Sequence, residues 1–213
     1  MKKCPACLTK DNLQEIYQTR EDYSLDSLTK IINIKNTVFF CNSCSHVMNS
    51  SINNVQDYYS ENYNINIDSE DEDQLYETKD KKNIFRTDHQ LEVFNSYYPE
   101  LSRVNILDYG CGKSSMGKKI CEQNNDISLH LFDVSDSYKE YWEKITHLER
   151  TAIYDIPVSW DQKFDIITSF FSLEHIDDVS GCLLRMHSLL KSSGEVYILV
   201  PNVLENIADL VVI

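Results

Sequence analysis

The sequence has no hydrophobic segment long enough to cross a membrane. Its longest unbroken apolar run is Val196–Val200, whereas a membrane-spanning helix needs about 20 apolar residues. No signal peptide precedes Cys4. We therefore expect a cytoplasmic protein with no membrane partner, in which thiols stay reduced.

Positive charge is also scarce. The chain has 20 Lys and Arg against 34 Asp and Glu, which gives a formal net charge of −14. Binding to nucleic acid requires a cluster of positive charge that contacts the phosphates, and no cluster of Lys and Arg stands out in this sequence. We therefore expect no nucleic-acid partner. With 42% hydrophobic residues, the 213-residue chain can still bury a core.

The segment Val104–Ser115, VNILDYGCGKSS, is a hydrophobic strand that runs directly into a Gly-x-Gly turn. An acidic residue at the end of a strand, followed by such a turn, lets a ligand contact bare backbone at a helix N-terminus. The segment is not a phosphate loop of the GxxxxGK[ST] type, because Leu107 stands where the first glycine is required. It predicts a pocket of the nucleotide-binding type.

Two carboxylates narrow the choice of ligand. Asp133, at the end of LHLFD, is the acid that a ribose-binding pocket has about 20 residues after its glycines. Asp108 lies two residues before the first glycine, where it would repel a pyrophosphate. S-adenosylmethionine (SAM) suits both acids, since its amino-acid end is cationic and its ribose hydroxyls can donate to Asp133. An NAD-dependent oxidoreductase remains an alternative, because Ser115 can serve as the third small residue of a dinucleotide motif.

Four segments resemble, in order, the motifs of class I SAM-dependent methyltransferases: ILDYGCG, LFDVS, FDIITSFFSLEHIDDV and LLKSSGEVYILVPN. The resemblance covers roughly residues 104–202 and implies SAM as cofactor. The cofactor-binding positions that it implies are Asp108, Gly110, Gly112, Asp133, Val134, Asp155, Ile156 and Phe170. It places Asp108 and the glycines at the methionine moiety, Asp133 at the ribose and Asp155 at the adenine.

Four cysteines near the N-terminus form two CxxC pairs, Cys4 with Cys7 and Cys41 with Cys44. Two such pairs complete a tetrahedral S4 site for zinc, and a site filled by protein ligands has a structural role. The segments LQEIYQT and TVFFC between the pairs are candidate strands of a hairpin. A redox pair and disulfides are the competing interpretations, of which the second is disfavoured in a cytosol.

The cysteine pairs, together with CNSCSHVMN and YYSENYN, resemble the N-terminal region of a subset of these methyltransferases. Members of that subset carry a cysteine-rich zinc-binding domain and commonly act on nucleotide-linked sugars or related surface carbohydrates. The resemblance implies a small sugar-linked or phosphorylated acceptor. O-methylation is favoured over C-methylation of a nucleotide-linked ketosugar, and a non-catalytic scaffold remains a further alternative.

The domain organisation follows from these segments. We predict a zinc-binding module at 1–63, an acidic linker or mobile loop at 64–82, and a SAM-binding domain at 83–213. Apolar spacing predicts a helix over Asn83–Tyr98, and Asp178 can cap a later helix. The strands predicted are Val104–Asp108, Leu129–Asp133, Thr151–Tyr154, Phe164–Thr168 and Glu195–Val200.

Strands that alternate with helices predict a parallel sheet, so the fold class is α/β, a Rossmann-like methyltransferase sheet with a small zinc-ribbon-like module. The family ordinarily has seven strands, but the sequence supplies about five before it stops at Ile213 inside the apolar stretch IADLVVI. We therefore expect a C-terminally truncated version of a longer protein. The open edge of the fifth strand makes a homodimer possible.

Two residues are candidates for the chemistry of methyl transfer. His175, in SLEHIDD after the fourth strand of the sheet, is the best candidate for a general base, because open α/β sheets bind ligands at the carboxyl ends of their strands. Its alternative role is to orient a turn. Tyr63, in YYSENY, is a candidate for a lid over the cofactor, although such aromatic residues also pack between domains.

Overall fold

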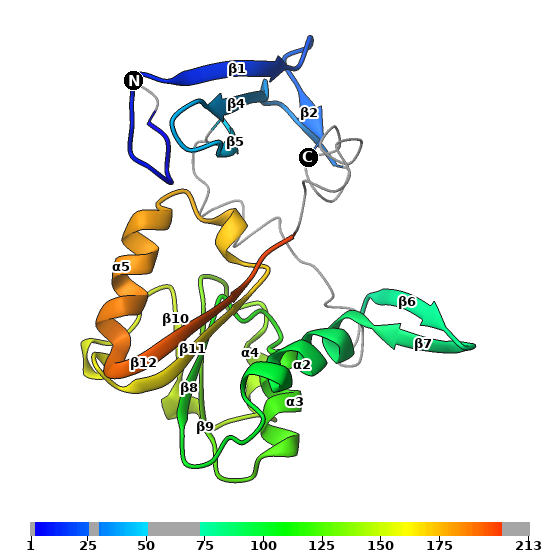
Figure 1. Cartoon of the computed structure of the whole chain (residues 1–213), viewed down its shortest axis with the longest axis vertical. Coiled ribbons are helices and arrows are strands. Elements are labelled where there is room, and N and C mark those ends of the chain that lie inside the picture. The colour runs from blue at the N-terminus through cyan, green and yellow to red at the C-terminus, as the bar shows by residue number, and fades with distance from the viewer. Residues whose placement is uncertain (1–2, 26–29, 51–72, 202–213) are drawn as a thin grey trace. The chain divides into compact units, whose positions relative to one another are not determined.

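The computed structural model describes residues 3–25, 30–50 and 73–201, and these form two compact units (Figure 1). The first unit contains the N-terminal strands together with residues 175–184, and the second contains residues 73–174 and 185–200. The predicted domain boundary at residue 63 and the candidate Tyr63 lie outside the described residues.

The N-terminal strands form a small antiparallel sheet in the order β1-β4-β5. Its strands are β1 (Leu13–Gln18), β4 (Thr37–Cys41) and β5 (Val47–Asn49), and a separate pair is formed by β2 (Ser24–Leu25) and β3 (Ile31–Ile32). Leu13 lies opposite Cys41 in the β1–β4 pair. The prediction that LQEIYQT and TVFFC are strands is thus confirmed.

The second unit is built on a five-stranded sheet in the order β10-β9-β8-β11-β12, in which every pair is parallel. The strands are β8 (Asn105–Tyr109), β9 (Ser128–Asp133), β10 (Thr151–Ile153), β11 (Phe164–Phe170) and β12 (Leu190–Leu199). The central strands are apolar because helices cover both faces of such a sheet. The predicted α/β, Rossmann-like sheet is therefore confirmed, with β12 beginning five residues earlier than expected.

Four described helices accompany the strands: α2 (Arg86–Tyr97), α3 (Ser115–Gln123), α4 (Lys139–Trp142) and α5 (Val179–Leu189). Short 3-10 turns cover Leu148–Arg150, Val158–Trp160 and Leu173–His175. The predicted cap of α5 is confirmed, since Asp178 Oδ1 accepts a hydrogen bond of 3.0 Å from the N–H of Gly181. None of the helices in the described part of the chain is long and apolar enough to span a membrane.

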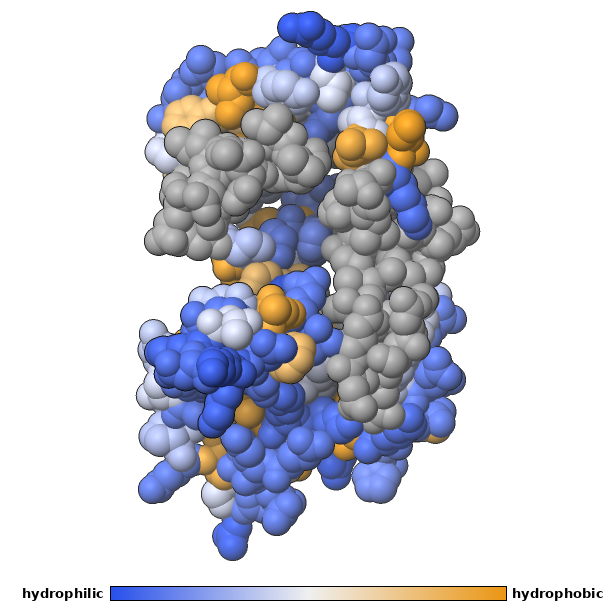
Figure 2. Space-filling model, turned by 90° about the vertical axis from the view of Figure 1, so that its right-hand side faces the viewer, coloured by the Kyte–Doolittle hydropathy of each residue, from blue (hydrophilic) through white to orange (hydrophobic). Residues whose placement is uncertain are grey.

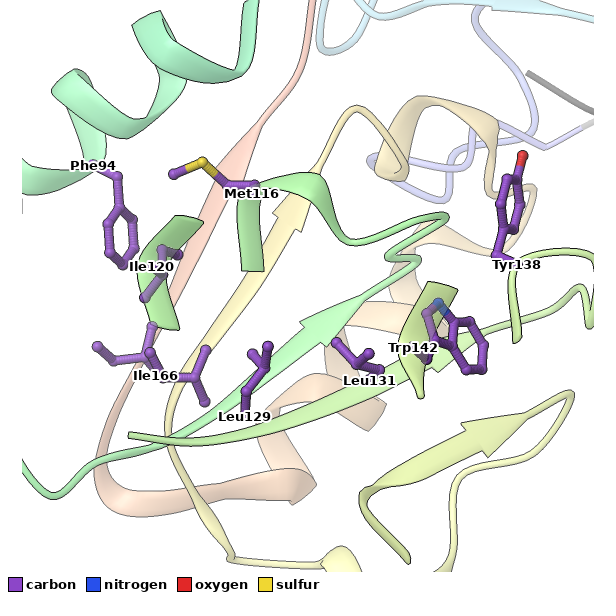
Figure 3. Close-up of a cluster of buried hydrophobic side chains, with 9 residues drawn as sticks. Phe94, Met116, Ile120, Leu129, Leu131, Tyr138, Trp142 and Ile166 are labelled. Carbon is purple, nitrogen blue, oxygen red and sulfur yellow. The ribbon is translucent and has the colours of Figure 1, made fainter. Parts of the chain in front are cut away.

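The hydrophobic core of the second unit lies between one face of the sheet and the helices α2, α3 and α4. Figure 3 shows side chains of this core on the three helices and on strands β9 and β11, and β8 contributes Ile106. The buried cluster consists of Phe94, Ile106, Met116, Ile120, Leu129, Leu131, Tyr138, Trp142 and Ile166. Packing of these side chains fixes the start of α3 against β8 and β9.

On the face shown in Figure 2, hydrophilic residues predominate around small apolar groups, as the net charge of −14 leads one to expect.

The segment before α2 differs from the sequence-based prediction. A hairpin of β6 (Leu75–Lys79) and β7 (Lys82–Phe85) occupies the end of the predicted acidic linker, and α2 begins at Arg86 rather than at Asn83. The two turn residues, Asp80 and Lys81, adopt positive φ values of 51° and 64°, as two-residue hairpin loops require. The prediction missed this hairpin because neither turn residue is glycine.

His130 of β9 is 2% exposed and packs edge-on against two aromatic rings, with ring centroids 5.0 Å from Trp160 and 5.1 Å from Phe164. Burial, reinforced by the positive charges of Lys163 and Arg150, lowers the pKa of His130 to about 4. The imidazole is therefore neutral in the folded protein at neutral pH. The unfolded chain, in contrast, takes up this proton near pH 6.5.

The difference between the pKa of His130 in the folded and in the unfolded protein makes the stability depend on pH. Since the unfolded state binds the proton first, we expect His130 to lower the free energy of unfolding by about 2 kcal/mol between pH 8 and pH 5, with the loss ending below pH 4. Urea unfolding of His130→Gln at both pH values should show a correspondingly smaller pH dependence. His187→Gln, at an exposed position of α5, is the control and should keep the dependence of the parent protein. If the stability of His130→Gln depended on pH as strongly as that of the parent protein, the lowered pKa of His130 would not be the cause.

Candidate cofactor site

The predicted ligand-binding segment lies where the strand order of the sheet reverses. Chain order runs outward from β8 through β9 to β10 on one side, and β11 and β12 lie on the other. In open α/β sheets, ligands bind at the carboxyl ends of the strands at such a reversal. Asp108 at the end of β8 lies opposite Thr168 of β11, directly at this point.

The carboxylate of Asp108 is 2% exposed and accepts two hydroxyl hydrogen bonds. Ser114 Oγ donates to Oδ2 at 2.6 Å, and Thr168 Oγ1 donates to Oδ1 at 3.2 Å. Burial raises the pKa of Asp108 to about 6, against the effect of the two hydroxyls and with a contribution from the charge of Asp133. Each oxygen retains a lone pair for a further donor. A cation placed beside this carboxylate would favour its ionised form.

The turn after β8 exposes backbone because two of its residues are glycines in left-handed conformations. Gly110 has a φ of 68° and Gly112 a φ of 50°. The N–H of Gly110 donates to the carbonyl of Phe132 at 2.8 Å, which fixes the turn against β9. A Cβ atom at Gly110 would lie 1.9 Å from Ser172 Oγ, so the structure admits only glycine there without rearrangement. The absence of a Cβ atom therefore lets the turn pack closely against the residues that follow β11.

Asp133, 8% exposed, joins the glycine turn to the end of β9. Its Oδ2 accepts from the N–H of Gly112 at 2.8 Å and its Oδ1 from the N–H of Ser135 at 3.0 Å. Burial raises the pKa of Asp133 although these N–H groups oppose the rise. The carbonyl of Asp133 also accepts from the N–H of Tyr154 at 3.0 Å, which brings the segment containing the exposed Asp155 to the same edge.

The other predicted cofactor residues have mixed surroundings. Val134 follows Asp133 and is 38% exposed, as a surface facing a ligand would be. The carbonyl of Ile156 accepts a hydrogen bond of 3.2 Å from Arg185. Phe170 packs edge-on against Phe94, with ring centroids 6.5 Å apart, and thereby contributes to the core. The roles of these residues in cofactor binding remain predictions.

His175 ends the 3-10 turn that directly follows β11. Burial lowers the pKa of His175 from its ordinary value, so the imidazole is neutral at neutral pH and able to accept a proton. This is the protonation state that a general base requires. The catalytic role of His175 remains a prediction.

Sequence reasoning did not identify the residues that support the turn. Ser114 and Thr168 supply the hydroxyls at Asp108, and Gly117 of α3 lets this helix approach them. A Cβ atom at Gly117 would lie 2.2 Å from Ser114 Oγ and 3.3 Å from Asp108 Oδ2. A glycine five residues after Gly112 was the available signal. The third small residue was predicted at Ser115 instead.

Arg86 was also missed. Its guanidinium carbon lies 3.5 Å from the ring centroid of Phe171, the residue that follows β11 and that adopts a φ of 52°. A bulky residue in this conformation is strained, and strain of this kind gathers at functional sites. Phe171 adjoins Ser172, which contacts Gly110. Arg86 thus brings a positive charge to the edge of the sheet at which Asp108 lies, a placement that depends on how α2 packs.

The four cysteines Cys4, Cys7, Cys41 and Cys44 are brought together in the first unit, with all four sulfur atoms within 4.8 Å of one another. The Sγ atoms of Cys4 and Cys44 are 3.7 Å apart, and those of Cys7 and Cys41 are 3.6 Å apart. A tetrahedral site with Zn–S bonds of about 2.3 Å requires sulfur atoms about 3.8 Å apart. The cluster therefore offers four thiol ligands that could hold a metal ion, and two of its sulfur pairs have the spacing of tetrahedral zinc coordination.

A parallel α/β sheet, with a glycine turn and two strand-end acids at its reversal, defines the class of Rossmann-like cofactor-binding domains. Residues 70–210 match the family model described as Methyltransferase domain. This match covers well over half of the chain, and the chain therefore belongs to that methyltransferase family.

Curated relatives fall in the same class. The chain is 23% identical over 118 residues to a ubiquinone biosynthesis O-methyltransferase from Rickettsia felis, with 53% of this chain and 47% of that protein covered. It is 25% identical over 96 residues to a malonyl-[acyl-carrier protein] O-methyltransferase from Acetivibrio thermocellus, with 44% and 34% covered. The chain thus matches about half the length of the first of these relatives.

Solved structures with a similar fold include a putative S-adenosyl-L-methionine-dependent methyltransferase from Methanococcus maripaludis. That structure is 24% identical, with a TM-score of 0.44, and the match covers 51% of this chain and 52% of the other. Coclaurine N-methyltransferase is 15% identical with a TM-score of 0.49, and the match covers 60% and 40% of the two chains.

Proposed function

We propose that this protein is a SAM-dependent methyltransferase that transfers a methyl group to an oxygen atom of a small polar acceptor. The observation that carries the proposal is the arrangement of Asp108, Asp133 and the glycine turn at the reversal of strand order. Membership of the methyltransferase family supports it. An NAD-dependent oxidoreductase is disfavoured by that membership.

The residues present fit SAM as the methyl donor. The glycine turn ends β8 beside both acids and packs against Ser172 in a way that a Cβ atom at Gly110 would prevent, and Asp133 can accept hydrogen bonds from a ribose diol. Asp108 supplies negative charge for a cationic amino-acid end. SAM, when bound, supplies an electrophilic methyl group carried on a sulfonium. The tasks left to the protein are to position the acceptor, exclude water and remove a proton from a neutral acceptor.

Two similarities to other methyltransferases support the proposed chemical class of the acceptor. The curated relatives are O-methyltransferases, one of ubiquinone biosynthesis and one acting on malonyl-[acyl-carrier protein], which favours an oxygen acceptor. The resemblance of the cysteine pairs to those of carbohydrate methyltransferases favours a sugar-linked or phosphorylated acceptor. A neutral hydroxyl would need His175 as base, whereas an anionic oxygen would attack without one.

We further propose that the four-cysteine cluster binds zinc and holds the N-terminal strands together. Strands of three to six residues bury little apolar surface, so a metal cross-link contributes much of the stability of a sheet this small. The proposal includes a cytoplasmic location, where thiols remain available as ligands. It also includes the possibility of a homodimer through the edge of β12.

The test uses the full chain. Isothermal titration calorimetry should show saturable binding of SAM and of S-adenosylhomocysteine, and both should raise the melting temperature. Incubation with methyl-labelled SAM and a pool of nucleotide sugars, phosphorylated sugars, quinone precursors and acyl carrier protein should then label one acceptor class. Binding of NAD without binding of SAM would overturn the proposal.

Donor binding should depend on pH through Asp108. Because a cation favours the ionised carboxylate, whose pKa is about 6 in the free protein, affinity for SAM should fall by about tenfold from pH 7 to pH 5. Calorimetry at both pH values measures the change. Asp108→Asn should bind more weakly at pH 7 and lose this dependence. Equal affinity at both pH values in the parent protein would refute the role given to Asp108.

A further inference from the structure

A cavity of about 280 Å³ lies in the second unit between the end of α3, the start of β9 and the segment after α4. Its lining consists of Cys121, Ile127, Leu129, Glu143, Lys144, Ile145, Thr146, His147 and Arg150. The lining combines three basic side chains with three branched apolar ones. A space of this size accommodates a small molecule with a charged and an apolar part.

The cavity is separate from the cofactor site. It borders Leu129, near the amino end of β9, whereas Asp133 and the glycine turn lie at the carboxyl end of the same strand. Parallel strands gather their carboxyl ends at one edge of a sheet, so the two sites lie at opposite edges. The cavity therefore has no part in holding the methyl donor.

Arg150 gives the cavity its charge. The side chain is half-buried, and its guanidinium makes no hydrogen bond or ion pair with any described residue. Its charge nevertheless acts on buried groups, since it opposes the burial-induced rise in the pKa of Cys121 and contributes to the lowered pKa of His130. In a chain with a net charge of −14, a half-buried guanidinium without a carboxylate partner is unusual.

The wall of the cavity is held by its own hydrogen bonds. Thr146 Oγ1 donates to the carbonyl of Leu129 at 2.9 Å, and the N–H groups of Ile145 and Thr146 donate to the carbonyl of Trp142 at 2.9 and 3.0 Å. These bonds hold the wall in place without using the side chain of Arg150. Trp142, in turn, donates from Nε1 to the carbonyl of Gly112 at 2.6 Å, which fixes the wall to the glycine turn.

We propose that this cavity is a second ligand site, which binds a small anion carrying a carboxylate or a phosphate. Arg150 is the principal anion-binding residue, because its planar guanidinium can donate two parallel hydrogen bonds to either group. Lys144 is a second cationic residue of the lining, and Glu143 is its single acidic residue. Ile127, Leu129 and Ile145 would contact an apolar portion of the ligand.

The experiment titrates the full chain with sodium hexanoate and, separately, with inorganic phosphate at constant ionic strength. We expect saturable binding by calorimetry and a shift of the Arg150 Nε–H resonance in ¹⁵N-labelled protein. Arg150→Gln identifies that resonance and should weaken binding at least about tenfold. If hexanoate binds more tightly than phosphate, the ligand is a carboxylate with an apolar tail. The reverse order indicates a phosphate ester.

Lys139→Gln is the matched control, because it removes one positive charge from the exposed start of α4 without changing the cavity lining. Its affinity for either anion should equal that of the parent protein. Circular dichroism verifies that both variants fold. Equal binding by the parent and Arg150→Gln, or no saturable binding of either anion, would overturn the proposal. Since SAM binding is measured separately, this outcome is distinguishable from failure of the methyltransferase assignment.

Discussion

Gly110→Ala is expected to abolish measurable SAM binding and to lower the free energy of unfolding by about 3 kcal/mol. Two costs combine at this position. A left-handed conformation costs about 1 to 2 kcal/mol in a residue with a Cβ atom. The added atom would also lie 1.9 Å from Ser172 Oγ and 2.7 Å from Ser172 Cβ, so the end of β8 and the residues after β11 would have to separate.

Gly112→Ala is the matched control. Gly112 has a similar positive φ of 50°, but the nearest atom to an added Cβ would be Tyr138 Cζ, at 4.0 Å. Only the backbone cost applies, and stability should fall by about 1 kcal/mol. Comparison of the two variants separates the effect of backbone strain from that of the close contact.

A double variant tests the contact itself. Ser172→Gly removes both atoms that an alanine at position 110 would meet, so combining it with Gly110→Ala should recover roughly the steric part of the lost stability. Urea unfolding measures the stabilities and calorimetry measures SAM affinity. If Gly110→Ala bound SAM as well as the parent protein, the turn would not be part of the cofactor site.

Cys41→Ser should remove bound zinc and unfold the N-terminal strands. Cys41 is fully buried, ends β4 and lies with its sulfur 3.6 Å from that of Cys7. Structural zinc contributes about 10 kcal/mol or more of binding free energy, far more than these short strands can replace. Metal analysis should find about one zinc per parent chain and little in the variant. Hydrogen exchange should then accelerate across β4 and β5 but remain slow in β8 and β9.

Cys121→Ser is the control for the loss of a thiol. Cys121 lies on α3, outside the four-cysteine cluster, so the variant should retain its zinc. A strong chelator should reproduce in the parent protein the exchange pattern of Cys41→Ser. If the parent protein, expressed with zinc available, contained no zinc and still protected β4 and β5 from exchange, the structural role of the metal would be wrong.

The strands of the large sheet were predictable because each is a short apolar run that ends at a polar or turn residue. Segments such as VNILDYG are apolar because both faces of the sheet are buried, so local hydrophobicity located β8, β9 and β11 to within a residue or two. The β6–β7 hairpin was not predictable in this way. Its residues Leu75–Lys79 are exposed and mostly polar, and only pairing with Lys82–Phe85 defines them as a strand.

The sequence alone determined the chemistry of the chain: four thiols in two pairs, and two acids at strand ends around a glycine turn. These features are local, because they depend on residue type and spacing. Tertiary structure decided which groups face the acids, namely Ser114, Thr168 and the N–H of Gly112. It also decided that Arg150 borders a cavity. These hydrogen bonds join residues 6, 21 and 60 positions apart, and strand order and helix packing set them rather than any local pattern.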